Sequence, residues 1–190
     1  TGEIVICLDD DVRGLTDEHI AIIARRFEDP SIAGVCFKVL DASSGKVTSW
    51  THHKPLAQFA DRPFETYDIT EGAVAFRRNV AISAGLYPEE FFISHEGVDL
   101  ACRIVDRGFR IVYEPSVTVV HEHSPKSRPT WRNYYFDTRN SIWVAMRNFP
   151  PLFGARYVSR QLGAMFLFAV RDGYILWWLR GLGDGLRGIP

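Results

Sequence analysis

The sequence predicts an α/β protein in which helices flank a mixed sheet and a helical extension follows. Through residues 1–128, β-branched apolar runs alternate with segments whose apolar residues recur at helical spacing. Residues 129–190 are helical in pattern and rich in aromatic side chains, with a break at Pro150 and Pro151. The chain has 190 residues, of which 46% are hydrophobic, so it can bury a core and disorder is excluded.

Local signals predict the individual elements. Residues 3–8 form a β-branched apolar run that is typical of a buried strand. Thr16 can cap the helix that follows, in which apolar residues recur at helical spacing. We further expect strands at 32–40, 46–50, 72–76, 110–113 and 117–121, helices at 79–85 and 97–107, and a loop at 51–68.

The charge is unevenly distributed along the chain. Residues 125–190 carry a formal charge of +7, whereas residues 1–124 carry −8. This asymmetry indicates a first part that binds a metal ion and a last part that faces phosphate or anionic lipid. A chance imbalance of solvated charges is the alternative.

Cysteine usage predicts a reducing compartment. Cys7, Cys36 and Cys102 lie in apolar runs without CxxC or metal-ligand spacing, so we expect them to be small buried hydrophobic residues. No signal-peptide pattern is present, since Thr1 leads almost directly into the first strand. We therefore expect a cytoplasmic protein whose chain begins within a domain.

Residues 152–186 combine aromatic side chains with several arginines. Their longest uncharged run, residues 161–170, has ten residues, whereas a membrane-spanning helix needs about 20. Amphipathic helices at the inner face of the cytoplasmic membrane fit this pattern, and so does packing against a partner chain or another domain. A nucleic-acid partner is not expected, because the aromatic residues fall within apolar helical stretches.

Three adjacent aspartates, Asp9, Asp10 and Asp11, follow the first predicted strand. A fold that gathers such like charges usually compensates with a cation, and oxygen ligands suit Mg²⁺ or Mn²⁺. The carboxyl edge of an α/β sheet is also where such folds bind ligands. A solvated acidic turn is the alternative.

Further polar candidates surround the helix predicted at residues 97–107. Glu96 lies at or just before its first residue, where it can act as a general base or cap the helix. Asp99 and Arg103 are spaced i,i+4, so an intrahelical ion pair is their expected structural role, and a place in the acceptor site is the alternative. His121 ends a β-branched strand, where it can ligate a metal ion or serve as a structural residue.

In order and spacing, four segments resemble family 2 of the inverting glycosyltransferases, which have the GT-A fold. The segments are GEIVICLDDDV, EGAVAFRRNVAISAGLYPEEFF, HEGVDLACRIVDRGFRIVYEPSVTVVHEHS and RNYYFDTRNSIWVAMRNFP. The resemblance covers residues 2–150, and its joint order makes it specific, whereas Asp-x-Asp alone is a weak signal. It implies the C-terminal portion of a GT-A-like domain truncated at its N-terminus, because the family's base-binding units precede the Asp-x-Asp strand.

The resemblance also implies roles for single residues. Asp11 would hold the metal ion, Asp9 would contact the metal ion or the donor ribose, and Asp10 would contribute to either. His121 matches a histidine that completes the metal shell in some relatives. The other matched positions would bind the donor, namely Gly72 and Ala73, where backbone approaches the substrate, and Arg139, which with Asn140 would lie near the diphosphate.

One departure concerns the catalytic base. The family has Glu-Asp or Asp-Asp where this chain has Glu96 and Gly97, and the second carboxylate is commonly the base. Gly97 cannot take a proton, so either Glu96 has inherited this role or the protein is impaired.

The predicted activity is therefore metal-assisted transfer of a sugar from a nucleotide-diphosphate sugar to a hydroxyl of a glycan or lipid-linked acceptor. The alternative is a non-catalytic or degenerate module that binds sugar nucleotides. A phosphatase of the haloacid-dehalogenase type is disfavoured, because its pattern requires Thr or Val where this chain has Arg13.

Overall fold

The computed structural model describes residues 2–122 and 130–188. The chain forms two compact units, one from Thr1–Leu86 and Leu100–Pro125 and the other from Tyr87–Asp99 and Lys126–Pro190. The boundary predicted between residues 128 and 129 lies outside the described residues and stays a prediction. The sequence pattern did not indicate that residues 87–99 belong with the helical unit.

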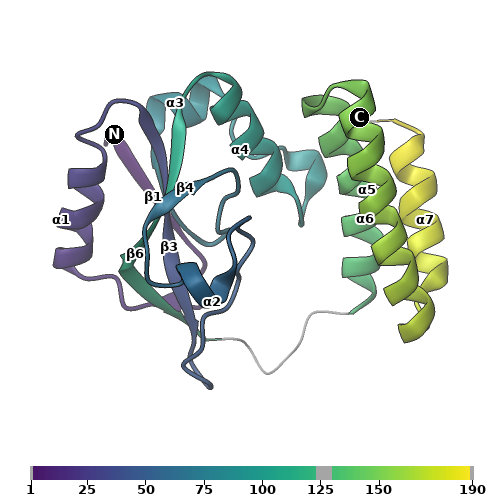
Figure 1. The fold of residues 1–190 in the computed structure, drawn as a ribbon, viewed down its shortest axis with the longest axis horizontal. Coiled ribbons are helices and arrows are strands. Elements are labelled where there is room, and N and C mark those ends of the chain that lie inside the picture. Colours follow the sequence, from purple (N-terminus) through teal and green to yellow (C-terminus); the bar gives the residue numbers. More distant parts are fainter. Residues whose placement is uncertain (1, 123–129, 189–190) are drawn as a thin grey trace. The chain divides into compact units, whose positions relative to one another are not determined.

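The described part of the first unit contains a mixed sheet of six strands (Figure 1). Its path is β1–β5–β3–β6–β2, and β4 also pairs with β6. The pair β3–β6 is parallel and the other pairs are antiparallel. The strands are β1 (Ile4–Leu8), β2 (Val12–Arg13), β3 (Ile32–Asp41), β4 (Phe64–Thr66), β5 (Ala73–Arg77) and β6 (Arg110–His121).

The helix α1 (Asp17–Arg26) covers one face of this sheet (Figure 1). Thr16 caps it as predicted, because its Oγ1 accepts a hydrogen bond from the backbone N–H of His19. Ile23 and Phe27 join the buried valines of β3 and β6 in one apolar cluster. The other elements before the helical region are α2 (Leu56–Phe59), α3 (Arg78–Ser83), the 3₁₀ turn η1 (Glu89–Phe91) and α4 (Glu96–Asp106).

Two sequence predictions in this region are wrong. The segment 46–50 is not a strand but makes one isolated bridge, Leu40 to Val47, because Ser49 takes a left-handed backbone conformation and ends the pairing. The segment 51–68 is not wholly a loop, since it contains α2 and β4.

The strands predicted at 110–113 and 117–121 are one continuous strand, β6. Its pairing with β3 shifts register between Phe37 and Lys38, opposite Glu114–Thr118. Pro115 lies within this irregularity, where its missing N–H costs no ladder hydrogen bond. Glu114 and Pro115, which in the sequence suggest an end of the strand, therefore lie at a β-bulge within β6.

Three helices make up most of the second unit, as the sequence pattern predicts: α5 (Trp131–Asn148), α6 (Pro151–Asp172) and α7 (Ile175–Leu186) (Figure 1). Their core contains Phe91, Ile142, Trp143 and Val144. None of the described helices is both long enough and apolar enough to cross a membrane.

Glycines allow α7 to approach α5 closely. A Cβ on Gly181 would collide with the backbone carbonyl of Tyr135, and a Cβ on Gly185 would lie 2.6 Å from the side chain of Ile142. Gly183, between them, faces open space. Gly181 and Gly185, spaced i,i+4, thus lie on the side of α7 that faces α5, where any larger residue would collide with α5.

Gly181→Ala is expected to lower the free energy of unfolding of the helical unit by about 1–3 kcal/mol, because α7 must move away from α5. Gly183→Ala is the matched control, and it should be neutral or stabilising by up to about 1 kcal/mol, since alanine has the higher helix propensity. Thermal unfolding followed by far-ultraviolet circular dichroism measures both. Equal effects of the two substitutions would contradict the close approach.

Candidate active site

The Asp-x-Asp segment forms a tight turn between β1 and β2. The backbone N–H of Val12 donates to the carbonyl of Asp9 at 3.1 Å, which closes the turn. The N–H of Asp9 donates to the carbonyl of Gly72 at 3.0 Å, which extends the β1–β5 pairing by one residue. Both aspartates are therefore held by backbone hydrogen bonds at the edge where β1 ends.

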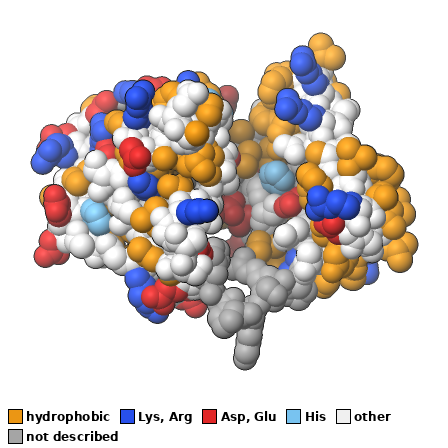
Figure 2. Space-filling view, turned by 60° about the horizontal axis from the view of Figure 1, so that its bottom comes forward, with side chains coloured by type: hydrophobic (Ala, Val, Ile, Leu, Met, Phe, Trp, Pro, Cys, Tyr) orange, Lys and Arg blue, Asp and Glu red, His pale blue; other side chains and the backbone are white. Residues whose placement is uncertain are grey.

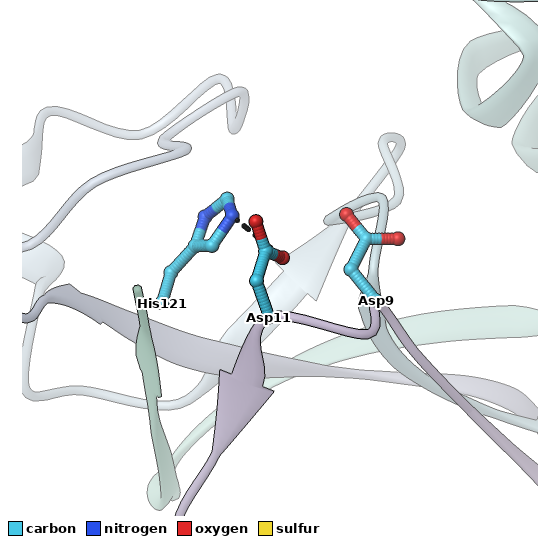
Figure 3. A group of neighbouring side chains, drawn as sticks. All are labelled: Asp9, Asp11 and His121. Atoms are coloured by element: carbon cyan, nitrogen blue, oxygen red, sulfur yellow. Dashed lines mark ion pairs between the residues drawn. The ribbon is translucent and has the colours of Figure 1, made fainter. Parts of the chain in front are cut away.

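His121 reaches the same edge from the end of β6. It pairs with Val12 on β2 and with Asp41 on β3, so its backbone lies between two neighbouring strands. Its Nε2 lies 3.0 Å from Oδ1 of Asp11, and the N–H of Glu122 donates to the carbonyl of Asp11 at 2.9 Å. Figure 3 shows the two side chains pointing toward one another.

Asp9, Asp11 and His121 form a group suited to a divalent cation. One ligand atom of each residue lies within 4.8 Å of the other two, and the side chains are partly exposed (Figure 3). Two carboxylates and one imidazole suit Mn²⁺, and the carboxylates suit Mg²⁺, both of which leave further positions for water or phosphate oxygens. The predicted metal ligands are thus brought together, whereas Asp10 is exposed and is not a member of this group.

The predicted donor residues Gly72 and Ala73 lie directly beside this group. Gly72 has a φ of +73°, and a Cβ there would overlap the carboxylate of Asp9. Ala73 is buried and pairs with Leu8 in the sheet. Gly72 therefore leaves the space that the carboxylate of Asp9 occupies.

Gly72→Ala is expected to weaken Mn²⁺ binding by about tenfold to a hundredfold, because the carboxylate of Asp9 must leave its place. Gly45→Ala is the matched control, since Gly45 has a similar φ of +64° but faces open space. Isothermal titration with Mn²⁺ measures both variants. If Gly45→Ala weakened binding as much as Gly72→Ala, the loss would come from backbone strain alone.

The proposed base, Glu96, is the first residue of α4 and follows a strained loop. Phe92, Ser94 and His95 have φ values of 65°, 72° and 65°, in the left-handed region that non-glycine residues rarely adopt. Each such residue costs about 1 kcal/mol or more, so surrounding contacts must hold the loop.

Asn140 and Arg139 supply those contacts within the helical unit. The side-chain amide of Asn140 donates to the carbonyls of Phe91, Ile93 and Ser94 at 3.1, 2.8 and 2.7 Å. Nη2 of Arg139 donates to the carbonyls of Glu90 and Phe91 at 3.0 and 2.9 Å. This pair therefore holds the loop before Glu96, and the predicted contact of Arg139 with the donor stays a prediction.

A polar cluster beside Glu96 was missed by sequence reasoning. The hydroxyl of Ser94 donates to the carboxylate of Asp137, which also interacts with His95. Burial lowers the pKa of His95, an effect that the nearby Asp137 opposes, and burial raises the pKa of Asp137. Asp137 lies within the quoted RNYYFDTRN segment, but its spacing from Ser94 gives no sequence signal of contact.

Asp99 and Arg103 both make contacts outside α4. The buried carboxylate of Asp99 accepts hydrogen bonds from Nε of Arg147 at 3.0 Å and from the amide of Asn148 at 2.7 Å. The guanidinium of Arg103 donates to the carbonyls of Ala84 and Leu86. These contacts support a structural role for both residues.

His52 and His53 lie in the segment 51–68, where the sequence offers no neighbouring metal-ligand residues. The contacts of His52 support a structural role. Its ring lies between the hydroxyls of Thr66 and Thr70, at 2.9 and 3.2 Å. Burial lowers the pKa of His52 to about 4, so the ring is neutral at physiological pH. His53 stacks on Tyr67.

Asn140→Asp is expected to lower the free energy of unfolding by about 3 kcal/mol or more, because a carboxylate would face three carbonyl oxygens and leave them unpaired. Asn133→Asp, on the exposed side of the same helix, is the control and should change stability little. Chemical denaturation measures both. Equal stability of the two variants would show that the loop does not need the amide of Asn140.

Comparisons with known proteins identify the fold. No protein-family model and no curated protein sequence matches the chain. Among solved structures, Staphylococcus aureus TarS 1–349 in complex with UDP-GlcNAc has a TM-score of 0.61 and 13% identity, over 100% of this chain and 58% of that one. The mannosyltransferase PcManGT from Pyrobaculum calidifontis, in complex with GDP-Man and Mn²⁺, has a TM-score of 0.51 and 15% identity, over 98% and 62%.

A third similar structure, GalNAc-T7 with UDP, GalNAc and Mn²⁺, has a TM-score of 0.51 and 14% identity, over 91% of this chain and 42% of that one. The mixed sheet flanked by helices is therefore a GT-A-like glycosyltransferase fold, as the sequence predicts. The chain spans between 42% and 62% of the length of these three proteins.

Proposed function

We propose that this chain is part of a divalent-metal-dependent, inverting glycosyltransferase of family 2 that uses a nucleotide-diphosphate sugar as donor. The observation that supports this most is the convergence of Asp9, Asp11 and His121 within 4.8 Å at one sheet edge of a GT-A-like fold. The similar structures hold GDP-Man with Mn²⁺, UDP and GalNAc with Mn²⁺, or UDP-GlcNAc, and these ligands support the same proposal.

Asp9, Asp11 and His121 would hold Mg²⁺ or Mn²⁺, which, when bound, would neutralise negative charge on the donor diphosphate. Asp10, Gly72 and Ala73 are proposed to contact the donor from the same edge. Arg139 is proposed as a further donor contact, although its hydrogen bonds to the carbonyls of Glu90 and Phe91 already occupy part of its guanidinium.

Glu96 is the proposed general base. Its carboxylate would take the proton of the acceptor hydroxyl while the hydroxyl oxygen forms a bond to the anomeric carbon. The bond from that carbon to the diphosphate oxygen breaks in the same displacement, so the nucleoside diphosphate leaves and the configuration inverts. Asp99 and Arg103 would hold α4, which begins with Glu96.

The acceptor is proposed to be a hydroxyl of a glycan or of a lipid-linked carrier, and no nucleic-acid partner is proposed. The place of action would be cytoplasmic, at the inner face of the membrane. Contact with that membrane is proposed separately, through residues 152–186.

Release of nucleoside diphosphate from a panel of nucleotide sugars tests the enzymatic proposal. Each assay is run with Mn²⁺ and, for comparison, with a chelator. Glu96→Gln should lower turnover by about 10²-fold or more while Mn²⁺-dependent donor binding survives. Asp11→Ala should remove both. Undiminished turnover by Glu96→Gln would disprove the assignment of the base.

A non-catalytic module that binds sugar nucleotides is the second candidate. The buried Gly97 favours it, because the resembling family has a carboxylate at this position. Metal-dependent donor binding without release of nucleoside diphosphate, even with acceptor extracts added, would establish this candidate in place of the enzyme.

A further inference from the structure

The helices α6 and α7 leave much apolar surface uncovered. Among the described residues, half of the large exposed hydrophobic side chains lie on these two helices, which make up less than a fifth of the chain. Isolated exposed leucines need no explanation, but a concentration of this kind marks an interaction surface. The residues are Leu152, Phe153, Phe166, Leu167, Phe168, Val170, Leu176, Leu179 and Leu186, and they define the outer surface.

The outer surface is distinct from the side that packs within the unit. On α6, Gly154 and Ala169 are buried, and Val158 and Leu162 pack against the core around Trp143. On α7, Gly181 and Gly185 face α5. The inner sides of both helices thus pack within the unit, and the apolar residues of the outer surface are not part of its core.

Arginines interrupt the outer surface at helical spacing. Arg156 and Arg160 follow Leu152 at intervals of four residues, and Leu167 continues the same stripe seven residues after Arg160. Figure 2 shows Lys and Arg side chains among hydrophobic ones over the helical unit. Apart from Asp172, α6 contains no acidic residue.

The two aspartates of α6 and α7 do not neutralise these arginines. Asp172 is engaged with Arg171 and with the hydroxyl of Tyr134. Asp184 is engaged with Arg187 and with the hydroxyl of Tyr135, and it also interacts electrostatically with Arg180 without forming an ion pair. In the part of the chain that the structure describes, Arg156, Arg160 and Arg180 form no ion pair, so the outer surface is apolar and cationic.

The combination of apolar side chains and unpaired arginines limits which partner can cover the outer surface. A two-fold contact with a second copy would place the unpaired arginines against a surface that is itself cationic, which disfavours it. An anionic bilayer offers an apolar interior for leucine and phenylalanine, with phosphates at the level that long arginine side chains reach. None of the described helices is long and apolar enough to cross a membrane. Helices that carry apolar side chains together with arginines lie in the membrane interface.

We propose that the outer surface of α6 and α7 docks on an anionic phospholipid bilayer. The apolar side chains near the turn between the helices enter the acyl boundary, and Arg156, Arg160 and Arg180 contact lipid phosphates. This inference does not depend on sugar transfer, since it concerns the helical unit alone.

Sedimentation with vesicles tests the docking without donor or metal. The full chain should pellet with vesicles of phosphatidylcholine and phosphatidylglycerol, and much less with phosphatidylcholine alone. The double variant Leu167→Glu with Leu176→Glu should lower partitioning by about tenfold or more. Ile82→Glu on α3 is the matched control, because Ile82 is 49% exposed but lies outside the outer surface, and it should bind as the parent does.

Arg156→Gln with Arg160→Gln should weaken binding to the anionic vesicles by about tenfold and leave the weak binding to neutral vesicles unchanged. Circular dichroism confirms that each variant is folded. The proposal is overturned if the full chain stays in the supernatant with both vesicle types, or if the leucine variant binds as tightly as Ile82→Glu. It is also overturned if gel filtration shows a dimer of the parent that the leucine variant dissociates.

Discussion

The geometry of the candidate site depends on the contact between Asp9 and Gly72. The hydrogen bond from the N–H of Asp9 to the carbonyl of Gly72 fixes where the Asp-x-Asp turn leaves β1. The missing side chain of Gly72 leaves the volume in which the carboxylate of Asp9 lies. Because β2 then pairs with the end of β6, the same turn brings Asp11 to His121. The hydrogen bond between Asp9 and Gly72 and the absence of a side chain at Gly72 thus help to bring Asp9, Asp11 and His121 together at the ends of β1, β2 and β6.

A second constraint acts on the residue proposed as base. Three non-glycine residues before α4 adopt left-handed backbone, a conformation that persists only where neighbouring groups enforce it. Asn140 and Arg139 enforce it through five hydrogen bonds to backbone carbonyls of residues 90–94. The Arg-Asn pair on α5 therefore supports the position of Glu96 at the start of α4.

Much of the fold could be predicted because its signals are local. The strand before Asp9, the capped helix after Thr16 and the helix that begins near Glu96 each carry their pattern in a few adjacent residues. The errors concern signals that tertiary contacts override. Pro115 suggests a break, but a bulge accommodates it within β6, and the segment at 46–50 loses its strand where the backbone turns at Ser49.

The candidate site could be predicted in part for the same reason. Asp9, Asp11 and His121 were identified because each follows or ends a predicted strand, and strand ends meet at a sheet edge. The contacts of Asn140 and Asp137 with residues 91–95 could not be predicted, because they join segments more than 40 residues apart with no shared period. The glycine at position 72 was recognised by resemblance, but its overlap with Asp9 becomes visible only in three dimensions.

The most direct test of the central claim is whether one divalent ion binds to Asp9, Asp11 and His121 together. Pulsed electron paramagnetic resonance of the protein with Mn²⁺ detects a nitrogen ligand by its coupling to the metal electron spin. We expect one bound Mn²⁺ with a nitrogen coupling that His121→Gln abolishes, and Asp11→Ala should remove binding. Mn²⁺ that binds without a nitrogen coupling, or binding that survives Asp11→Ala, would contradict the account.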